Sequence, residues 1–541
     1  MANLSLHPSG LPPPLQHPVI GHIQGRYNKG VVQYLGIKYA SLKDRLAEPE
    51  VIEYQGGQDI NATRHGPPVV TPAGAADMEM SFIQEHLPKP DLPPMSDLEG
   101  LNLNITVPQD GGENLPVVVY VHGGGFAFGS STYPHYDQSK VVELSAIMDQ
   151  RIVAVNLNYR LGITGFLTSK ELRDSGIKAN RGLRDQRAAL LWIKKYISGF
   201  GGDPGRITVV GQSAGATSVN FQLQCAEPLF HQAVLFGGSF LMMRPATEDI
   251  AENMYKAVTG TLGLGALTPE KRVEALLTLP QDRLVAEITR ELMSLGPVVD
   301  GDFISVTPTF DGLADLPLPG RKWCRRLWMV DSQFDGSIFG LINLNAREKG
   351  IAAAFVASVE KSLGAEAASK LLGFYSISRD TPDAEALISI IQFVTDISIY
   401  APAVKLAESW SGPSYLGHFN ERNPFEGLYK GRANHLLDIA YLWGNYNQKY
   451  TKQNWTVARA LAEDLVAFVN GKDDLPVFKD GEGEAGERLV TIYGPSEENI
   501  SSKTERLGTE ATGRNHGIFA LAEETGGLDV LLDAMGAFLR E

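Results

Sequence analysis

Residues 206–218, RITVVGQSAGATS, constrain the fold more than any other stretch of the chain. The β-branched run at 207–210 is followed at once by Gly211 and Gly215, which flank Ser213. A serine hydroxyl stands clear of the backbone when a buried strand ends in a sharp turn, and such a turn leaves no room for side chains beside it. The stretch therefore predicts a strand, a tight turn that carries a nucleophile, and a helix. A glycine-rich loop that contains a serine by chance is the alternative.

Strand-like and helical patterns alternate on both sides of this turn. Strand-like runs occur at 116–124, 151–159, 233–236, 325–330 and 414–419, and the first two are continuous apolar runs bounded by turn residues, which are typical of buried strands. After the second of these runs, apolar residues at helical spacing predict a helix over 182–200. Strands that alternate with helices predict a mostly parallel sheet covered by helices on both faces.

Longer segments separate some of these strands. We expect one continuous domain over residues 1–541, with helical insertions at about 241–320 and 340–410. The segment 65–95 contains seven prolines and predicts a long irregular surface loop. Amphipathic runs at 457–469 and 528–539 predict helices that pack on the body or on another copy, so the chain permits a homodimer.

Charge and cysteine content exclude several classes of protein. A formal net charge of −15 argues against nucleic-acid binding, and no window of 18 consecutive apolar residues predicts a membrane span. The N-terminus has no basic region followed by an apolar stretch, so we expect no secretory signal. Two cysteines, Cys225 and Cys324, do not make a disulfide-stapled secreted domain, and both are expected to be small buried hydrophobes. We therefore expect a cytoplasmic protein with neither a cofactor nor a metal.

A serine nucleophile needs a base, and the base needs an orienting acid. In folds with this turn the chain order is serine, acid, histidine, which leaves His418, His435 and His516 as candidate bases. His418 lies inside a strand-like run, whereas His435 lies in a loop that leads into a helix and suits the role better. For the acid, Asp335 follows a strand and precedes a Gly-Ser turn, and Asp331 is the neighbouring alternative.

Acyl transfer also needs donors for the carbonyl oxygen that becomes negative. The stretch VHGGGFAFGS, residues 121–130, has three glycines after a strand, so its backbone N–H groups can converge without obstruction by side chains. A phosphate-binding loop is the alternative interpretation, but no G-K-[ST] follows.

Further stretches extend the pattern over nearly the whole chain: GRYNKGVVQYLGIKYASLKDRLAEPE, LNLNI, NLNYRLGITGFL, NRGLRDQRAALLWI, FGGDPGRITVVGQSAGATSV, FDGSIF and GRANHLLDIAYLWG. With YVHGGGFAFGS, these stretches resemble the type-B carboxylesterases, the cholinesterase-like branch of the α/β-hydrolases. The resemblance implies an α/β-hydrolase fold. It also implies a nucleophile at Ser213, a general base and acid at His435, and an orienting carboxylate at Asp335.

The same resemblance implies the residues around the reacting atoms. The expected oxyanion donors are the N–H groups of Gly124, Gly125 and Ala214. Phe126 and Phe128 stand beside the oxyanion loop and are expected to bind substrate, with core packing as the alternative role.

The chain departs from the family pattern in ways that bear on substrate. Asp335 stands where most members have Glu, and Gln212 replaces the usual Glu before the nucleophile, so stabilisation of a cation should be weaker. Gly237 removes a nearby hydroxyl, and Gly100 removes a cysteine of the preceding loop. Segment 65–95 has no tryptophan, which cholinesterases use there to face a quaternary ammonium, so we do not expect choline esters.

We therefore expect a serine-dependent carboxylic ester hydrolase that acts on a small-molecule ester through an acyl-enzyme. An acyltransferase or lactone-processing enzyme that tailors a biosynthetic intermediate is the alternative. A non-catalytic adhesion module of the same family is disfavoured by the complete triad.

Overall fold

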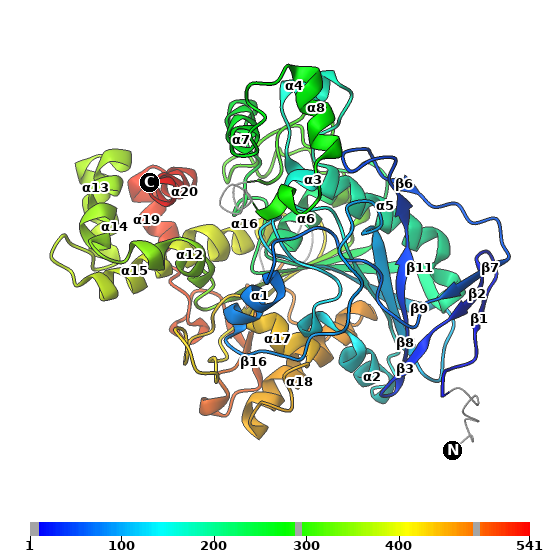
Figure 1. Cartoon of the computed structure of the whole chain (residues 1–541). Coiled ribbons are helices and arrows are strands. Elements are labelled where there is room, and N and C mark those ends of the chain that lie inside the picture. Colours follow the sequence, from blue (N-terminus) through cyan, green and yellow to red (C-terminus); the bar gives the residue numbers. More distant parts are fainter. Residues whose placement is uncertain (1–9, 287–294, 480–486) are drawn as a thin grey trace.

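A computed structural model describes residues 10–286, 295–479 and 487–541 (Figure 1). The first nine residues, on which the expectation about a secretory signal depends, lie outside the described residues.

The described residues contain one large sheet of 11 strands. From β10 to β15 all neighbouring strands are parallel, and the antiparallel pairs are confined to the two sides of this block. In spatial order the strands are β16 (Ser502–Arg506), β15 (Leu489–Tyr493), β14 (Ser414–Phe419), β13 (Arg326–Ser332), β12 (Gln232–Phe236), β11 (Gly202–Gln212), β9 (Leu115–Val121), β10 (Val153–Leu157), β8 (Asn102–Pro108), β4 (Val31–Lys38) and β3 (Arg26–Asn28). The predicted mostly parallel sheet is confirmed.

The central strands are continuous apolar runs because both of their faces are covered. In Figure 1, α5 (Arg181–Tyr196) and α6 (Ala214–Gln222) lie above the sheet, whereas α2 (Ser139–Ile147), α17 (Leu437–Trp443) and α18 (Lys452–Val469) lie below it. The amphipathic helix α5 shows how this covering works: Leu183, Leu190 and Ile193 are buried, whereas Lys194 is partly exposed. Two small sheets flank the body: β1 (Leu15–His17), β2 (Gly21–Gln24) and β7 (Gln58–Asn61), and the pair β5 (Ala40–Ser41) and β6 (Glu50–Val51).

Both predicted insertions contain helices, although residues 295–319 of the first form none. The first contains α7 (Glu248–Thr261), α8 (Pro269–Thr278), α9 (Arg283–Ala286) and α11 (Gly320–Trp323), and in Figure 1 its α7 and α8 stand beside α3 (Gly162–Phe166) and α4 (Lys170–Asp174). The second follows α12 (Ser337–Ile342) and contains α13 (Ile351–Leu363), α14 (Ala365–Phe374), α15 (Asp383–Thr395) and α16 (Ala401–Ser409).

Both predicted C-terminal helices pack within their own chain. The first is α18, which contacts α2 and α17. The second is α20 (Leu528–Arg540), which with α19 (Ile518–Thr525) lies against α13 and α14 of the second insertion (Figure 1). The apolar face of α20, including Leu531 and Phe538, is therefore buried on the body.

The prediction of a wholly irregular loop at 65–95 is wrong, because α1 (Ala75–Ile83) forms inside it. The prolines of this segment lie on either side of α1, and the nine residues between have none. Met80, Phe82 and Ile83 are buried, so the helix is held by its apolar face.

A helical run over 383–409, made of α15, a π-helical turn and α16, is long and apolar enough to cross a membrane. Most of its apolar stretch is buried inside the protein, where α16 contacts β13 and β14. This helical run is therefore part of the buried core of the fold. Cys225 and Cys324 are both free.

Candidate active site

Ser213 lies at the sharp turn between β11 and α6, where its backbone φ is 55°. A positive φ is strained for a residue with a side chain, so the surroundings must hold it. The flanking glycines are required by close approach: a Cβ at Gly211 would lie 2.5 Å from the carbonyl oxygen of Gly215. A Cβ at Gly215 would lie 2.0 Å from the carbonyl oxygen of Val121. The serine is therefore held up by a tight strand-to-helix turn and not by a loose loop.

Asp335 and His435 come from two loops that run side by side after β13 and β14. The N–H of Phe334 donates to the carbonyl oxygen of Ala433 at 2.8 Å and joins these loops. Oδ1 of Asp335 lies 2.5 Å from Nδ1 of His435, and Oδ2 of Asp335 accepts the N–H of Ser332 at 2.9 Å. Because both side chains are buried, the carboxylate holds the orientation of the imidazole.

The charge of His435 reflects opposed effects. Burial lowers the pKa of His435, but the charge of Asp335 and its hydrogen bond raise it, and the net pKa lies above the ordinary 6.5. Asp438, on α17, is another buried carboxyl close to this pair. Burial and the charge of Asp335 raise the pKa of Asp438 to about 7. The dyad therefore lies beside a carboxyl that is partly protonated near neutral pH.

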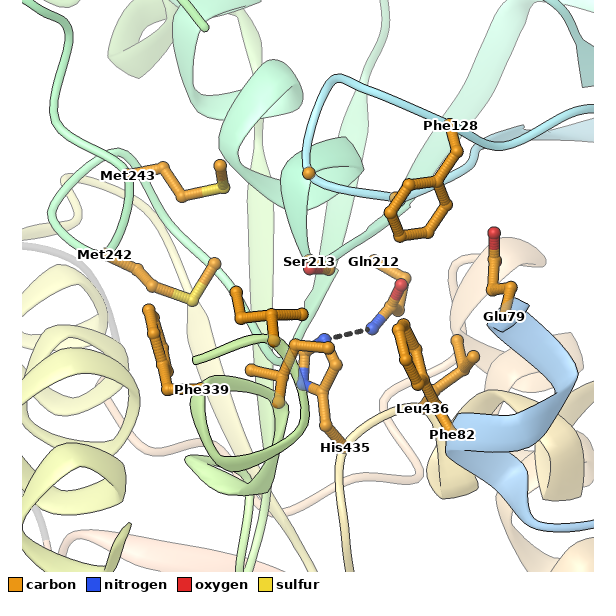
Figure 2. Close-up of a pocket in the computed structure, with 14 residues that line it drawn as sticks. Glu79, Phe82, Phe128, Gln212, Ser213, Met242, Met243, Phe339, His435 and Leu436 are labelled. Carbon is orange, nitrogen blue, oxygen red and sulfur yellow. Dashed lines mark hydrogen bonds between the residues drawn. The ribbon is translucent and has the colours of Figure 1, made fainter. Parts of the chain in front are cut away.

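Gln212 contacts the other ring nitrogen of His435. The side-chain nitrogen of Gln212 lies 3.0 Å from Nε2 of His435 (Figure 2). An amide nitrogen only donates, so Nε2 accepts and carries no proton. Nδ1 then carries the proton and donates it to Asp335, which is the tautomer that a general base needs. Within the described residues no hydrogen bond joins the Ser213 hydroxyl to His435, and Gln212 takes that position on the ring.

Ser213, Gln212 and His435 line one cavity that contains about 550 Å³ of empty space, part of it open to solvent. Its walls are mostly apolar, with side chains from α1, from the start of the first insertion and from α12 (Figure 2). These include Phe82, Phe128, Met242, Met243, Phe339 and Leu436. A cavity of this kind suits an apolar group next to the serine hydroxyl.

Gly124 and Gly125 line the same cavity, and both have a positive φ, at 92° and 59°. Ala214 is the first residue of α6, directly after the serine. In the described part of the chain, the N–H groups of these three residues donate to no other group. Three backbone donors are thus free near the serine, as an oxyanion requires.

The two phenylalanines beside this loop have different surroundings. Phe128 lines the cavity, with its ring 6.2 Å from that of Phe82. The expectation for Phe126 is corrected: its ring packs 4.7 Å from that of Phe166, is fully buried, and does not line the cavity. A φ of 61° at Phe126 turns the chain there, and the core-packing alternative describes this residue.

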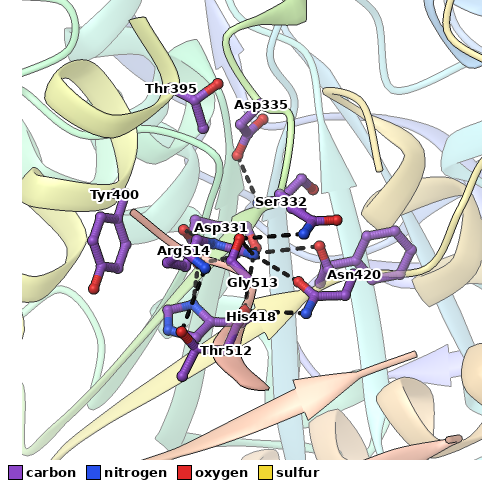
Figure 3. Close-up of polar contacts among 12 residues, drawn as sticks. Asp331, Ser332, Asp335, Thr395, Tyr400, His418, Asn420, Thr512, Gly513 and Arg514 are labelled. Carbon is purple, nitrogen blue, oxygen red and sulfur yellow. Dashed lines mark hydrogen bonds and ion pairs between the residues drawn. The ribbon is translucent and has the colours of Figure 1, made fainter. Parts of the chain in front are cut away.

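The other candidate acid and base belong to a separate buried network (Figure 3). Nδ1 of His418 lies 2.5 Å from Oδ1 of Asp331, and Nε of Arg514 donates to Oδ2 of Asp331 at 2.8 Å. Burial raises the pKa of Asp331, but the charges of Arg514 and His418 lower it by more than burial raises it. The net pKa of Asp331 is therefore below its ordinary value. His516 instead contacts the hydroxyl of Tyr400 at 2.8 Å. None of these residues lines the cavity.

Replacing Arg514 with leucine should destabilise the fold by about 3–5 kcal/mol, because it leaves the buried charge of Asp331 unpaired. The free energy of unfolding in urea measures this change. Arg422→Leu is the matched control, since Arg422 pairs with Glu497 at the surface and its loss should cost less than about 1 kcal/mol. Equal losses for the two variants would contradict the structural role of the network.

Sequence reasoning missed two acidic residues here, Asp438 and Glu79. Glu79 is buried and lines the cavity, and it shares a face of α1 with Phe82 and Ile83. A lone carboxylate among apolar residues at helical spacing is the signal that could have found it. The described residues contain no group of three or more His, Cys, Asp or Glu side chains that could hold a metal ion.

Comparisons with known proteins identify the family of the chain and its fold. The model of the family described as "Carboxylesterase family" matches residues 13–484. The para-nitrobenzyl esterase of Bacillus subtilis (strain 168) is 28% identical over 438 residues, which is 79% of this chain and 82% of that protein. The pyrethroid hydrolase Ces2a of Mus musculus is 29% identical over 462 residues, 80% of this chain and 78% of that protein.

A solved structure of a PNB esterase superposes with a TM-score of 0.69 at 24% identity, over 92% of this chain and 98% of that one. This likeness confirms the α/β-hydrolase fold.

Proposed function

Because the chain belongs to the carboxylesterase family, we propose that it hydrolyses carboxylic esters through an acyl-enzyme formed on Ser213. The observation that carries the proposal is the set of residues that line one cavity. This cavity is lined by a serine at a tight turn, by an imidazole paired with a buried carboxylate, and by glycines whose N–H groups donate to no other group among the described residues. The relatives named as an esterase and a hydrolase favour hydrolysis over the acyl-transfer alternative.

In the proposed reaction the hydroxyl oxygen of Ser213 attacks the ester carbonyl while Nε2 of His435 takes the hydroxyl proton. The oxyanion is stabilised by the N–H groups of Gly124, Gly125 and Ala214. The carbon–oxygen bond to the alcohol breaks as His435 protonates the leaving oxygen. His435 then deprotonates water, which attacks the acyl carbon. The bond from that carbon to the serine oxygen breaks as His435 returns the proton to Ser213, and the carboxylic acid is released. Asp335 stabilises the imidazolium at both steps.

The direct test is to find the acyl group on the chain. Wild-type protein is mixed with p-nitrophenyl esters of graded acyl length, and release of nitrophenol is followed over the first turnover. We expect a burst of product, and mass spectrometry of the acid-quenched protein should find the acyl mass on the peptide that contains Ser213. Turnover with an acyl mass on another residue would contradict the proposed nucleophile, and absence of turnover at every acyl length would contradict hydrolysis.

The contact between Gln212 and His435 leads to a prediction about pH. His435 must be neutral to act as a base, so kcat/KM should fall as the pH drops through the pKa of His435, which lies above 6.5. In Gln212→Glu a carboxylate adjoins Nε2 and stabilises the imidazolium, so the acidic limb should move upward by about one pH unit or more. A pH profile of kcat/KM measures this shift.

Gln212→Leu is the matched control for this profile. It removes the same contact to Nε2 without adding charge, so the acidic limb should move upward by much less than in Gln212→Glu, since only a hydrogen bond to the neutral ring is lost. An unchanged limb in Gln212→Glu would show that residue 212 does not adjoin the titrating group.

A further inference from the structure

One wall of the cavity depends on the position of the short helix α1, which carries Phe82. Figure 2 shows the rings of Phe82 and Phe128 on one side of the cavity, with Met242 and Phe339 on the other. The apolar face of α1 is buried, but apolar packing is not directional and does not by itself fix how far a ring extends into the cavity. The directional bonds that hold the end of α1 therefore set the size of this side of the cavity.

The C-terminal end of α1 is held by two side-chain amides from a distant part of the chain. The last carbonyl groups of a helix have no N–H partner within the helix and need one from elsewhere. Nδ2 of Asn434 donates to the carbonyl oxygen of Phe82 at 2.8 Å, and Nδ2 of Asn423 donates to the carbonyl oxygen of Ile83 at 3.1 Å. The residue that lines the cavity is thus bonded through its own carbonyl.

The two amides form one buried unit, which we call the amide clamp. Oδ1 of Asn434 accepts from Nδ2 of Asn423 at 2.8 Å, and Oδ1 of Asn423 accepts the N–H of Phe425 at 2.9 Å. Both side chains are buried, at 0% and 1% exposure. Each amide therefore has one orientation that satisfies its partners, and loss of either amide leaves a buried carbonyl without its donor.

The amide clamp is part of the loop that carries His435. Nδ2 of Asn434 also donates to the carbonyl oxygen of His435 at 3.1 Å. The N–H of His435 donates in turn to the hydroxyl oxygen of Ser337 at 2.9 Å, which fixes the loop from its other side. The same backbone thus places the imidazole and, through Asn434, the wall formed by Phe82.

We propose that Asn434 is a positioning residue that determines specificity: it holds the Phe82 wall at a fixed distance from the reacting atoms and so sets the size of the apolar group that the cavity accepts. This inference rests on the proposed function, because the group belongs to an ester. A closely packed apolar pocket distinguishes groups that differ by one methylene by about tenfold or more. Without the bond from Asn434, α1 is free to shift and this discrimination weakens.

Two series of esters test the proposal. p-Nitrophenyl esters of graded acyl length vary the acyl group, and acetate esters of graded alcohols vary the alcohol. Phe82→Ala identifies the series that faces this wall, because its size preference should weaken. In Asn434→Ala the ratio of kcat/KM between the best ester and the next longer one should fall about tenfold in that same series, while the other series keeps its ratios.

Three results would overturn the proposal. An equal loss on every ester in Asn434→Ala would mean that Asn434 only supports the histidine or the fold. Wild-type ratios in this variant would mean that the wall does not depend on it. If Phe82→Ala alters neither series, the wall does not contact the substrate.

Asn445→Ala is the matched control. The side-chain amide of Asn445 also donates to two backbone carbonyls, those of His135 at 3.1 Å and Asp137 at 2.8 Å, but neither lies on α1 and Asn445 does not line the cavity. Both series should keep their wild-type ratios in this control. Asn423→Ala removes the other half of the amide clamp without adjoining His435, and it should weaken the same series as Asn434→Ala. If Asn434→Ala does not fold, wild-type ratios in Asn423→Ala would overturn the proposal.

Binding without turnover separates this inference from the proposed function. Straight-chain alcohols of graded length are added to the whole protein, and their affinities are measured by ligand-observed nuclear magnetic resonance. The affinity should depend steeply on length in the wild type and less steeply in Phe82→Ala and Asn434→Ala. This pattern without ester hydrolysis contradicts the proposed function and supports the role of Asn434. Hydrolysis with unaltered preferences in Asn434→Ala contradicts this inference alone, and absence of both hydrolysis and the pattern contradicts both.

Discussion

Ser213→Ala should lower kcat for ester hydrolysis by about 10⁶-fold, which is the size of effect that follows loss of the nucleophile in a comparable triad. The reason is chemical: alanine has no atom that can form the acyl-enzyme, and the remaining contacts can only orient substrate and water. Because the side chain at 213 is small and its backbone is held by the turn, alanine should keep the fold. Steady-state kinetics with a p-nitrophenyl ester measure the loss.

A fluorophosphonate probe gives an independent measure of the same residue. Wild-type protein should become labelled with loss of activity, whereas Ser213→Ala should not be labelled. Ser218→Ala is the matched control, because Ser218 lies on the same helix and donates its hydroxyl to the carbonyl oxygen of Ala214 at 2.8 Å. It should retain the label. Equal labelling of Ser213→Ala and wild type would refute a nucleophile at this position.

Asp335→Asn should lower kcat by about 10⁴-fold with little change in the fold. Asparagine has nearly the same shape, but its amide removes the charge that stabilises the imidazolium. It can also donate to Nδ1 of His435, which then holds the wrong tautomer. Steady-state kinetics measure this change, and the affinity for a non-reactive substrate analogue should be much less affected, since Asp335 does not line the cavity.

Asp438→Asn is the control for this prediction. Asp438 is as buried as Asp335 and lies close to it. Because its pKa is about 7, part of the Asp438 carboxyl is already protonated and neutral near pH 7, and asparagine is neutral as well. We expect a loss of less than tenfold. A larger loss in Asp438→Asn than in Asp335→Asn would reverse the roles of the two carboxyls.

Several expectations from the sequence remain predictions. The chain permits a homodimer, but its C-terminal helices already bury their apolar faces on their own body. A cytoplasmic location, the absence of a nucleic-acid partner and the acceptor of the acyl group also remain to be measured. Gel filtration, fractionation of cells and analysis of products with and without a candidate alcohol would test them.

Sequence patterns predicted the elements whose cause is local. The strand residues at 207–210 and 414–419 are rich in apolar or β-branched residues, and all of them are buried, as is typical of strands covered on both faces. The turn at Ser213 was predictable for a similar reason, because only glycine fits where backbone atoms pass so closely. In contrast, α1 was missed because prolines dominate the composition of segment 65–95 while a short apolar face decides its structure.

The side chains of the cavity were harder to predict, because their positions depend on segments far apart in the chain. Phe126 and Phe128 are two residues apart in the sequence, yet one packs in the core and the other lines the cavity. Only the folded chain decides this, since Phe166 and Phe82 supply the partners.

By itself, the sequence determined the alternating central strands and helices, the tight turn at Ser213 and the family of the protein. The strands and the turn follow from the spacing of apolar residues and glycines, which acts within a few residues, whereas the family follows from motifs along the chain and from the family model that matches residues 13–484. The tertiary structure alone decided that Gln212 caps the imidazole of His435 and that Glu79, on α1, is buried beside the same cavity. A hydrogen bond requires two groups to meet within about 3 Å, and for residues hundreds of positions apart this is set by packing and not by pattern.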